Sequence, residues 1–195
     1  MPRYEFRIFR KVLGALEIKL QRYLPPDETA SSSELYLISP HTDENNVKIR
    51  EGTLEIKTLI QRWSGLEQWQ PVLKADFPLP ADLLANEFFP RLVVPAPRLE
   101  REQYAFEEFL ADLIQAQPDL YLAQVAKLRQ KFRVEGCQAE LSDVTIEGQP
   151  WRTVALEAED RQAVLRAQTT LGLAELENIN YVKAIKQVLA VAPAS

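Results

Sequence analysis

The chain has 195 residues, 46% hydrophobic and 26% charged, an ordinary composition for a globular protein that buries one core as a single domain or as two closely packed halves. Its formal net charge of −5 argues against a general nucleic-acid-binding protein. The only cysteine is Cys137 and the only histidine is His41, which excludes an intrachain disulfide, a thiolate metal site and a histidine-based catalytic triad. Because the sequence contains neither a membrane-spanning apolar run nor an N-terminal signal-peptide core, we expect a cytoplasmic protein.

The N-terminal part of the chain changes between strand and helix patterns. Tyr4, Phe6 and Ile8 alternate with Glu5, Arg7 and Phe9, which predicts a strand over 3–9. Apolar residues at helical spacing predict a helix over 11–23, which the proline pair at 25–26 ends. The polar run at 28–34 predicts a loop, and residues 34–39 predict a short strand.

The stretch at 46–59, NVKIREGTLEIKTL, predicts two strands joined at Glu51 and Gly52. Its apolar residues alternate with full charges, which are Lys48, Arg50, Glu55 and Lys57. Two like charges on one face lie about 6.6 Å apart and repel by roughly 2.5 kcal/mol at an effective dielectric of about 20. Lys48 and Arg50 therefore need solvent, a carboxylate partner or a bound anion.

Residues 61–100 contain six prolines interleaved with aromatic residues. Such a stretch is neither one long helix nor a central strand, and it is too apolar to be disordered. We predict a connector packed onto the protein, with one short helix near 81–87. It would join two halves, about 1–60 and 101–195, of a single domain spanning 1–195.

The second half repeats this plan. We predict a helix over 101–116, a strand that ends at 134, strands at 138–146 and 152–159, and closing helices at 160–170 and 178–191. In the strand KLRQKFRV, the apolar Leu128, Phe132 and Val134 share one face and the cations share the other. Antiparallel strands with helices inserted between them define the α+β class.

The charged faces of these strands form one set. The cations are Arg7, Lys48, Arg50, Lys57, Arg129, Lys131 and Arg133, and the carboxylates are Glu5, Glu55, Glu157 and Glu159, with Glu140 as a weaker member. A sheet that curls with this face inward forms a cavity suited to phosphate oxygens, and its carboxylates suit magnesium or manganese. The alternative is an open antiparallel sheet whose charged face is solvated.

Several stretches resemble the CYTH superfamily of triphosphate tunnel enzymes, which includes thiamine triphosphatases, inorganic triphosphatases and CYTH-type adenylate cyclases. NVKIREGTLEIK resembles the basic hairpin of that family, KLRQKFRV its later Arg/Lys strand, AELSDVTIEGQPWRTVALEAED its hairpin ending in Glu-x-Glu, and ENINYVKAIK its closing helix. The resemblance implies an eight-stranded antiparallel β-tunnel with helices packed outside it. It also implies a triphosphate bound inside the tunnel and a divalent metal cofactor, Mg²⁺ or Mn²⁺.

The first strand departs from the family pattern. The family carries Glu-x-Glu-x-Lys there, and those glutamates help to hold the metal. Here Glu5 is kept, Arg7 stands in place of the second carboxylate, and Phe9 stands in place of the lysine. The exchange of a carboxylate for Arg7 changes the local charge by two units and should weaken metal binding, so the chain resembles an atypical member with a degenerate motif.

Two hypotheses follow. The first is a metal-dependent phosphohydrolase acting on a triphosphate or polyphosphate, with Glu157 and Glu159 catalytic and Glu5, Glu157 and Glu159 holding the metal. Its phosphates would be bound by Arg7, Lys48, Arg50, Lys57, Arg129, Lys131 and Arg133. The second is a non-catalytic module that binds an anionic metabolite or a phosphorylated partner in the same tunnel. A nucleotide cyclase is a weaker idea, because no motif reads a purine base.

The expected partner is a small polyanion, namely a triphosphate, a nucleotide or a polyphosphate, and the second hypothesis also allows a phosphorylated partner. Neither hypothesis involves general nucleic-acid binding or a membrane, and we expect a monomer or a homodimer.

Overall fold

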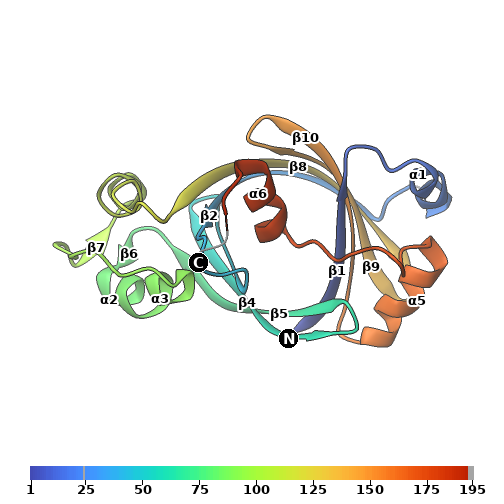
Figure 1. Cartoon of the computed structure of the whole chain (residues 1–195), viewed down its shortest axis with the longest axis horizontal. Coiled ribbons are helices and arrows are strands. Elements are labelled where there is room, and N and C mark those ends of the chain that lie inside the picture. The colour runs from blue at the N-terminus through green and yellow to red at the C-terminus, as the bar shows by residue number, and fades with distance from the viewer. Residues whose placement is uncertain (24, 193–195) are drawn as a thin grey trace.

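The computed structural model describes residues 1–23 and 25–192. Eight strands form its central barrel: β1 (Arg3–Arg10), β2 (Glu28–Ile38), β3 (Asn45–Arg50), β4 (Thr53–Trp63), β5 (Leu66–Asp76), β8 (Tyr121–Val134), β9 (Cys137–Ile146) and β10 (Gln149–Ala158). The barrel is closed and antiparallel in the order β1-β10-β9-β8-β2-β3-β4-β5, and β5 returns to β1 (Figure 1). The predicted α+β class and eight-stranded antiparallel tunnel are confirmed.

Four tight turns, each ending in glycine, connect successive strands of the barrel. In each turn both residues have positive φ, at Glu51-Gly52, Ser64-Gly65, Glu135-Gly136 and Glu147-Gly148. Two consecutive positive φ angles are typical of type I′ turns, whose twist matches that of an antiparallel hairpin. The turn predicted at Glu51-Gly52 is therefore confirmed, with the strand pair β3–β4 on either side of it.

The prediction of a packed connector is wrong for residues 61–76. These residues complete β4 and form β5, which closes the barrel against β1. The proline that argued against a strand, Pro71, lies at an irregularity where the register shifts between Ile56 and Lys57 on the partner strand. A β-bulge is one of the few places in a sheet that tolerates proline. The division of the domain into two halves stays a prediction.

Two further local predictions need correction. The polar run predicted as a loop is part of β2, whose outward-facing Ser31 and Ser33 are exposed beside the exposed Leu128 of β8. The outer face of this strand pair is solvated, so its residues need not be apolar. The helix predicted over 101–116 is instead β7 (Gln103–Tyr104), α4 (Phe106–Glu108) and the π-helical turn η3 (Phe109–Ile114).

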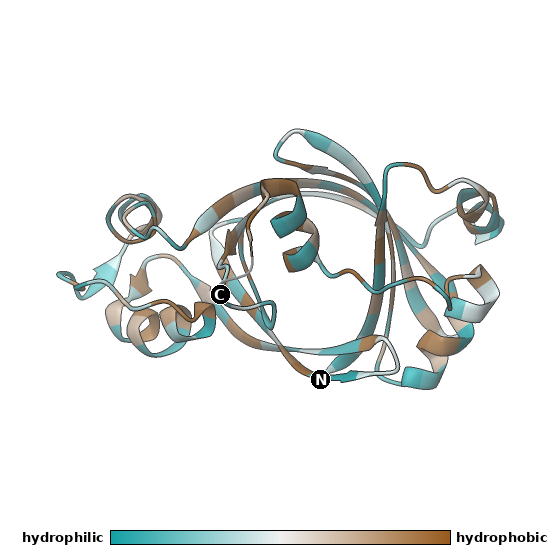
Figure 2. Ribbon diagram, viewed as in Figure 1, coloured by the Kyte–Doolittle hydropathy of each residue, from teal (hydrophilic) through white to brown (hydrophobic). Residues whose placement is uncertain are grey.

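The remaining helical elements pack outside the barrel in two groups. On one side lie α1 (Ala15–Leu20), the 3-10 turn η1 (Gln21–Tyr23) and α5 (Arg161–Leu171). On the other side lie α2 (Ala81–Leu83), η2 (Leu84–Phe88), α3 (Phe89–Leu92), α4 and η3, with β6 (Leu79–Pro80) paired to β7. The short helix predicted near 81–87 is thus present. Figure 2 shows hydrophobic and hydrophilic residues interspersed along the strands between these groups.

The last helix, α6 (Tyr181–Leu189), lies within the outline of the barrel in Figure 1. Its buried residues, among them Tyr181 and Ile185, pack against inward-facing apolar residues such as Phe9, Tyr36 and Val125. The side chain of Asn180 caps the helix by accepting a hydrogen bond from the backbone N–H of Lys183, at 3.0 Å. The apolar cluster around α6 thus fills one end of the barrel. No helix of the described residues is long and apolar enough to cross a membrane.

Candidate functional site

The inward-facing side chains of the barrel line a cavity of about 250 Å³, which we call the tunnel. Seven cations line it, namely Arg7, Lys48, Arg50, Lys57, Lys127, Arg129 and Lys131. Four carboxylates line it as well, namely Glu5, Glu55, Glu140 and Glu157. The alternation seen in the sequence produces this lining, because successive side chains of a strand point to opposite faces. The open-sheet alternative is therefore wrong, since the barrel encloses the charged face.

The structure brings eight of the ten predicted site residues to the tunnel: Glu5, Arg7, Lys48, Arg50, Lys57, Arg129, Lys131 and Glu157. Arg133 and Glu159 instead line a neighbouring pocket of about 430 Å³, which shares Gln138 and Glu157 with the tunnel. Arg133 is close to the end of β8, and Glu159 follows the last residue of β10. Both therefore lie past the stretch of strand that lines the tunnel.

Arg7 is buried, with 8% of its surface exposed, and lies between two carboxylates. Its Nε donates to Glu5 Oε1 at 2.9 Å, and its Nη1 donates to Thr153 Oγ1 at 3.2 Å and to Glu140 Oε1 at 3.4 Å. Its guanidinium carbon is 4.7 Å from the centre of the Tyr181 ring. Burial alone would lower the pKa of Arg7, but Glu5 raises it above its ordinary value. Burial likewise opposes the ionisation of Glu5, yet Arg7 holds its pKa below the ordinary value.

A second buried cluster surrounds Glu34, which is 2% exposed. Its Oε2 accepts from Lys127 Nζ at 2.7 Å, from Lys48 Nζ at 3.1 Å and from the hydroxyl of Tyr36 at 3.1 Å. Burial would raise the pKa of Glu34, but Lys127 and Lys48 lower it well below its ordinary value. For Lys127, burial is the largest influence and lowers the pKa to about 7, against the opposing effect of Glu34.

On the basic hairpin β3–β4, a carboxylate offsets the repulsion between Lys48 and Arg50. Glu55 accepts from Arg50 Nη2 at 2.7 Å, and its other oxygen lies 3.4 Å from Lys48 Nζ. Lys131 pairs with Glu28 of β2 at 2.9 Å. Lys57, by contrast, has no ion-pair or hydrogen-bond partner among residues 1–23 and 25–192. The Lys57 ammonium is therefore available to a bound anion.

Three buried polar atoms of the tunnel lining also lack hydrogen-bond partners within the described part of the chain. They are Tyr181 Oη, Arg129 Nε and Asn46 Oδ1. A buried polar group without a partner costs about 1–3 kcal/mol, so each such group requires an explanation. Tyr181 Oη and Arg129 Nε are hydrogen-bond donors, and an anion in the tunnel would supply the acceptors that they lack.

Comparison with known proteins identifies the fold. No protein-family model and no curated protein sequence matches the chain. Among solved structures, a putative adenylyl cyclase from Hippeastrum, described as having a dominant triphosphatase activity, matches with TM-score 0.52 at 11% identity, covering 95% of this chain and 96% of that one. A putative adenylate cyclase from Bacillus halodurans matches with TM-score 0.50 at 14% identity, covering 94% and 97% respectively. The PH1012 protein from Pyrococcus horikoshii matches with TM-score 0.50 at 14% identity, covering 93% and 99%.

The chain has the CYTH-like tunnel fold. Within this CYTH-like tunnel, the carboxylates do not fit a resident divalent ion as they are arranged. A hard divalent cation needs several oxygen ligands at one point, and the described residues contain no group of three or more His, Cys, Asp or Glu that could hold a metal. Of the predicted metal ligands, Glu5 is bound to Arg7, Glu157 lies 3.6 Å from Arg3, and Glu159 is outside the tunnel.

Sequence reasoning missed Lys127, Glu34 and Tyr181. Lys127 has the same inward parity as Arg129 and Lys131, so continuing the alternation two residues further back would have found it. Glu34 was missed because it stands where the polar run predicted as a loop meets the predicted strand 34–39, and no charged neighbour of the same parity follows it in that strand. No sequence signal would have found Tyr181, because only the tertiary packing of α6 directs it into the CYTH-like tunnel.

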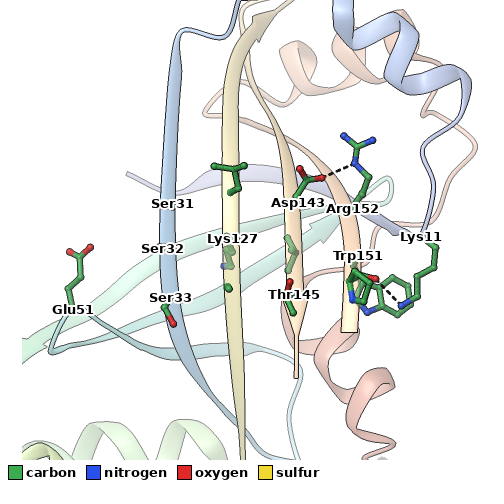
Figure 3. A pocket seen from close by; sticks show the side chains of 14 residues that line it. Lys11, Ser31, Ser32, Ser33, Glu51, Lys127, Asp143, Thr145, Trp151 and Arg152 are labelled. Atoms are coloured by element: carbon green, nitrogen blue, oxygen red, sulfur yellow. Dashed lines mark hydrogen bonds and ion pairs between the residues drawn. The ribbon is translucent and has the colours of Figure 1, made fainter. Parts of the chain in front are cut away.

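A larger hollow of about 1020 Å³ lies on the outer side of the sheet formed by β2, β8, β9 and β10 (Figure 3). Its cations at 11, 127 and 152 are already engaged, Lys127 with Glu34 at 2.7 Å. Lys11 Nζ donates to the carbonyl of Pro150 at 2.9 Å and lies 3.6 Å from the centre of the Trp151 ring, and Arg152 Nε donates to Asp143 at 2.9 Å. Among the described residues that line this surface, none offers an anion a free cation comparable to Lys57, so the tunnel is the candidate site.

Proposed function

We propose that the protein binds a small anion carrying several phosphate groups, a triphosphate or a short polyphosphate, inside its tunnel. The observation that carries the proposal is the lining itself. Seven cations face four carboxylates around about 250 Å³, and Lys57, Arg129 Nε and Tyr181 Oη have no acceptor among the described residues. Charge-assisted hydrogen bonds to phosphate oxygens are the strongest contacts that such groups make.

Ion pairs along the lining determine which groups remain for the ligand. Arg50 and Lys131 are paired with Glu55 and Glu28, while Glu34 engages Lys48 and Lys127. The pairs of the buried Glu34 hold Lys48 and Lys127 inside the barrel when the tunnel is empty, because a buried charge needs a partner. An anion of several charges would then complete the partly satisfied donors along the lining, so the site is organised before the ligand binds.

Thermal unfolding with and without tripolyphosphate tests this proposal. A ligand present at a hundred times its dissociation constant stabilises the native state by about 2.7 kcal/mol. For a chain of this size that corresponds to a rise in Tm of about 5–11 °C. Lys57→Met should reduce the shift strongly. Arg98→Met, which removes a cation from an exposed position outside the tunnel, should leave it unchanged. Equal shifts in both variants would place the binding elsewhere and refute the proposal.

Hydrolysis of the bound triphosphate in the presence of Mg²⁺ or Mn²⁺ is the second candidate. It is supported by the fold shared with the Hippeastrum protein described as having triphosphatase activity, and by Glu157 in the tunnel lining. Phosphate release from tripolyphosphate would then be lost in Glu157→Gln. It would persist in Glu159→Gln, because Glu159 lies in the neighbouring pocket. Release that survives Glu157→Ala combined with Glu159→Ala would exclude this candidate.

A further inference from the structure

We propose that Arg7 occupies the place of a divalent cation in the tunnel, so that the polyanion is bound without metal. The inference rests on the proposed function and adds to it the nature of the counter-charge. It starts from Glu5 and Glu140, two carboxylates that converge on one point of the lining. The point on which they converge is the guanidinium of Arg7.

Arg7 already occupies the carboxylate oxygens of Glu5 and Glu140 that a metal would need as ligands. Glu5 Oε1 accepts from Nε at 2.9 Å, and Glu140 Oε1 lies 3.4 Å from Nη1. The same oxygen of Glu140 also accepts from the hydroxyl of Ser142 at 3.0 Å, which fixes that carboxylate. Mg²⁺ and Mn²⁺ favour sites of several oxygens in near-octahedral geometry. A divalent ion could take these ligands only by displacing Arg7.

Displacing Arg7 is unfavourable for two reasons. The guanidinium cannot lose its proton to relieve the repulsion between itself and an incoming divalent ion, because Arg side chains stay charged in proteins. Its position is also fixed by the rest of the barrel: the backbone N–H donates to Asn178 Oδ1 at 2.9 Å, Nη1 donates to Thr153 at 3.2 Å, and the guanidinium lies against Tyr181. A buried cation driven from its carboxylates would be left unpaired, which is costly in a protein interior.

Arg7 can also contact the anion directly. Its Nε and Nη1 are engaged, whereas Nη2 has no hydrogen-bond or ion-pair partner among residues 1–23 and 25–192. Arg7 lines the tunnel together with Tyr181, whose hydroxyl also lacks a partner in that part of the chain. One guanidinium thus contacts two carboxylates and offers a donor to a phosphate oxygen, whereas in a metal site the ion would supply the positive charge.

The experiment uses tripolyphosphate and Mn²⁺ as probes on the full chain. Calorimetric titration of the wild type with tripolyphosphate should give the same affinity after treatment with EDTA as before it, and added Mn²⁺ should not increase it. Titration of the wild type with Mn²⁺ alone should show no site in the tunnel. Tripolyphosphate binding that requires Mn²⁺, or wild-type Mn²⁺ binding that Glu5→Gln abolishes, would overturn the inference.

Variants at position 7 give the converse test. Arg7→Glu frees Glu5 and Glu140 and adds a third carboxylate, so it should acquire one Mn²⁺ site per chain and lose metal-free tripolyphosphate affinity by about tenfold or more. Arg50→Met is the matched control: it removes one tunnel cation but leaves the Glu5–Glu140 pair occupied, so it should weaken tripolyphosphate binding without gaining Mn²⁺. An Arg7→Glu protein that folds and binds no Mn²⁺ would contradict the assignment.

The outcomes separate this inference from the function on which it rests. Absence of tripolyphosphate binding under every condition refutes the proposed function, and with it the metal-free binding. Binding that is present but dependent on Mn²⁺ leaves the function standing and refutes the role of Arg7. Should Arg7→Glu fail to fold, the wild-type titrations with EDTA and Mn²⁺ still decide between these results.

Discussion

Anion binding in the tunnel should depend on pH through Lys127. Burial lowers the pKa of this lysine to about 7, and Lys48 adds to the effect, whereas Glu34 opposes it. Phosphate bound beside the ammonium favours its charged form. Below pH 7 Lys127 is already protonated and binding takes up no proton. Above pH 7 the protein must take up a proton as it binds, so the affinity falls as the pH rises.

The magnitude follows from the protonated fraction of the empty tunnel. With a pKa of about 7, Lys127 is about half protonated at pH 7 and about 1% protonated at pH 9. If the bound anion raises the pKa of Lys127 close to the ordinary value of a lysine, the tripolyphosphate affinity falls about 50-fold between pH 7 and pH 9. The groups that face Lys127 come from four elements: Glu34 and Tyr36 of β2, Lys48 of β3, Arg7 of β1 and Tyr181 of α6. Burial raises the pKa of both tyrosines, so neither titrates in this range.

The assay is calorimetric titration with tripolyphosphate from pH 6 to pH 9 on three proteins. Lys127→Met removes the titrating group, so its pH profile reports only the ionisation of the ligand and of the remaining residues. Lys127→Arg keeps the charge across the range, and its affinity should hold at pH 9. A wild-type profile parallel to that of Lys127→Met would refute the reasoning, because the pH dependence would then come from elsewhere.

Three further predictions concern named contacts. Glu34→Gln leaves Lys127 and Lys48 without their shared carboxylate and should lower the free energy of unfolding by about 3–5 kcal/mol in urea titrations; a loss below about 1 kcal/mol would mean that the cluster relaxes into solvent. Tyr181→Phe should raise the Tm of the ligand-free protein, because it removes a buried hydroxyl that has no partner among the described residues, and should weaken tripolyphosphate binding by about three- to tenfold. Unchanged affinity would exclude the hydroxyl as a ligand contact. Gly65→Ala should destabilise the protein by about 1 kcal/mol, because the φ of 78° at this position strains any residue with a Cβ, although the Cβ itself would meet no other atom. Ser64→Ala is the control, and equal Tm values in the two variants would contradict the turn assignment.

The architecture of the barrel follows largely from alternation in the sequence. The period-two pattern of β3 and β4, with their Glu51-Gly52 turn, is sufficient to predict that hairpin and the inward direction of its charges. The same reasoning fails at β5, because Pro71 argues against a strand unless the bulge opposite Lys57 is known. A bulge depends on the partner strand, which the local sequence does not specify.

The candidate site could be predicted in part, for a similar reason. Cations on the inward face of a strand can be read from the alternation, so Lys48, Arg50, Arg129 and Lys131 are found without a structure. Which carboxylate meets which cation depends on strand order. Arg7 and Glu140 belong to strands that are far apart in sequence, and their approach requires β10 to lie between β1 and β9. Sequence spacing alone therefore does not reveal that Arg7 lies between Glu5 and Glu140.

A crystal structure of the full chain grown with tripolyphosphate in the presence of EDTA tests the central claim most directly. The account predicts a phosphate chain inside the tunnel, with oxygens in hydrogen-bond contact with Lys57, Tyr181 Oη and Arg7 Nη2, and with the Arg7–Glu5 pair intact. Tripolyphosphate bound only on the outer face, or a tunnel that stays empty at saturating ligand in solution and in the crystal, would contradict it.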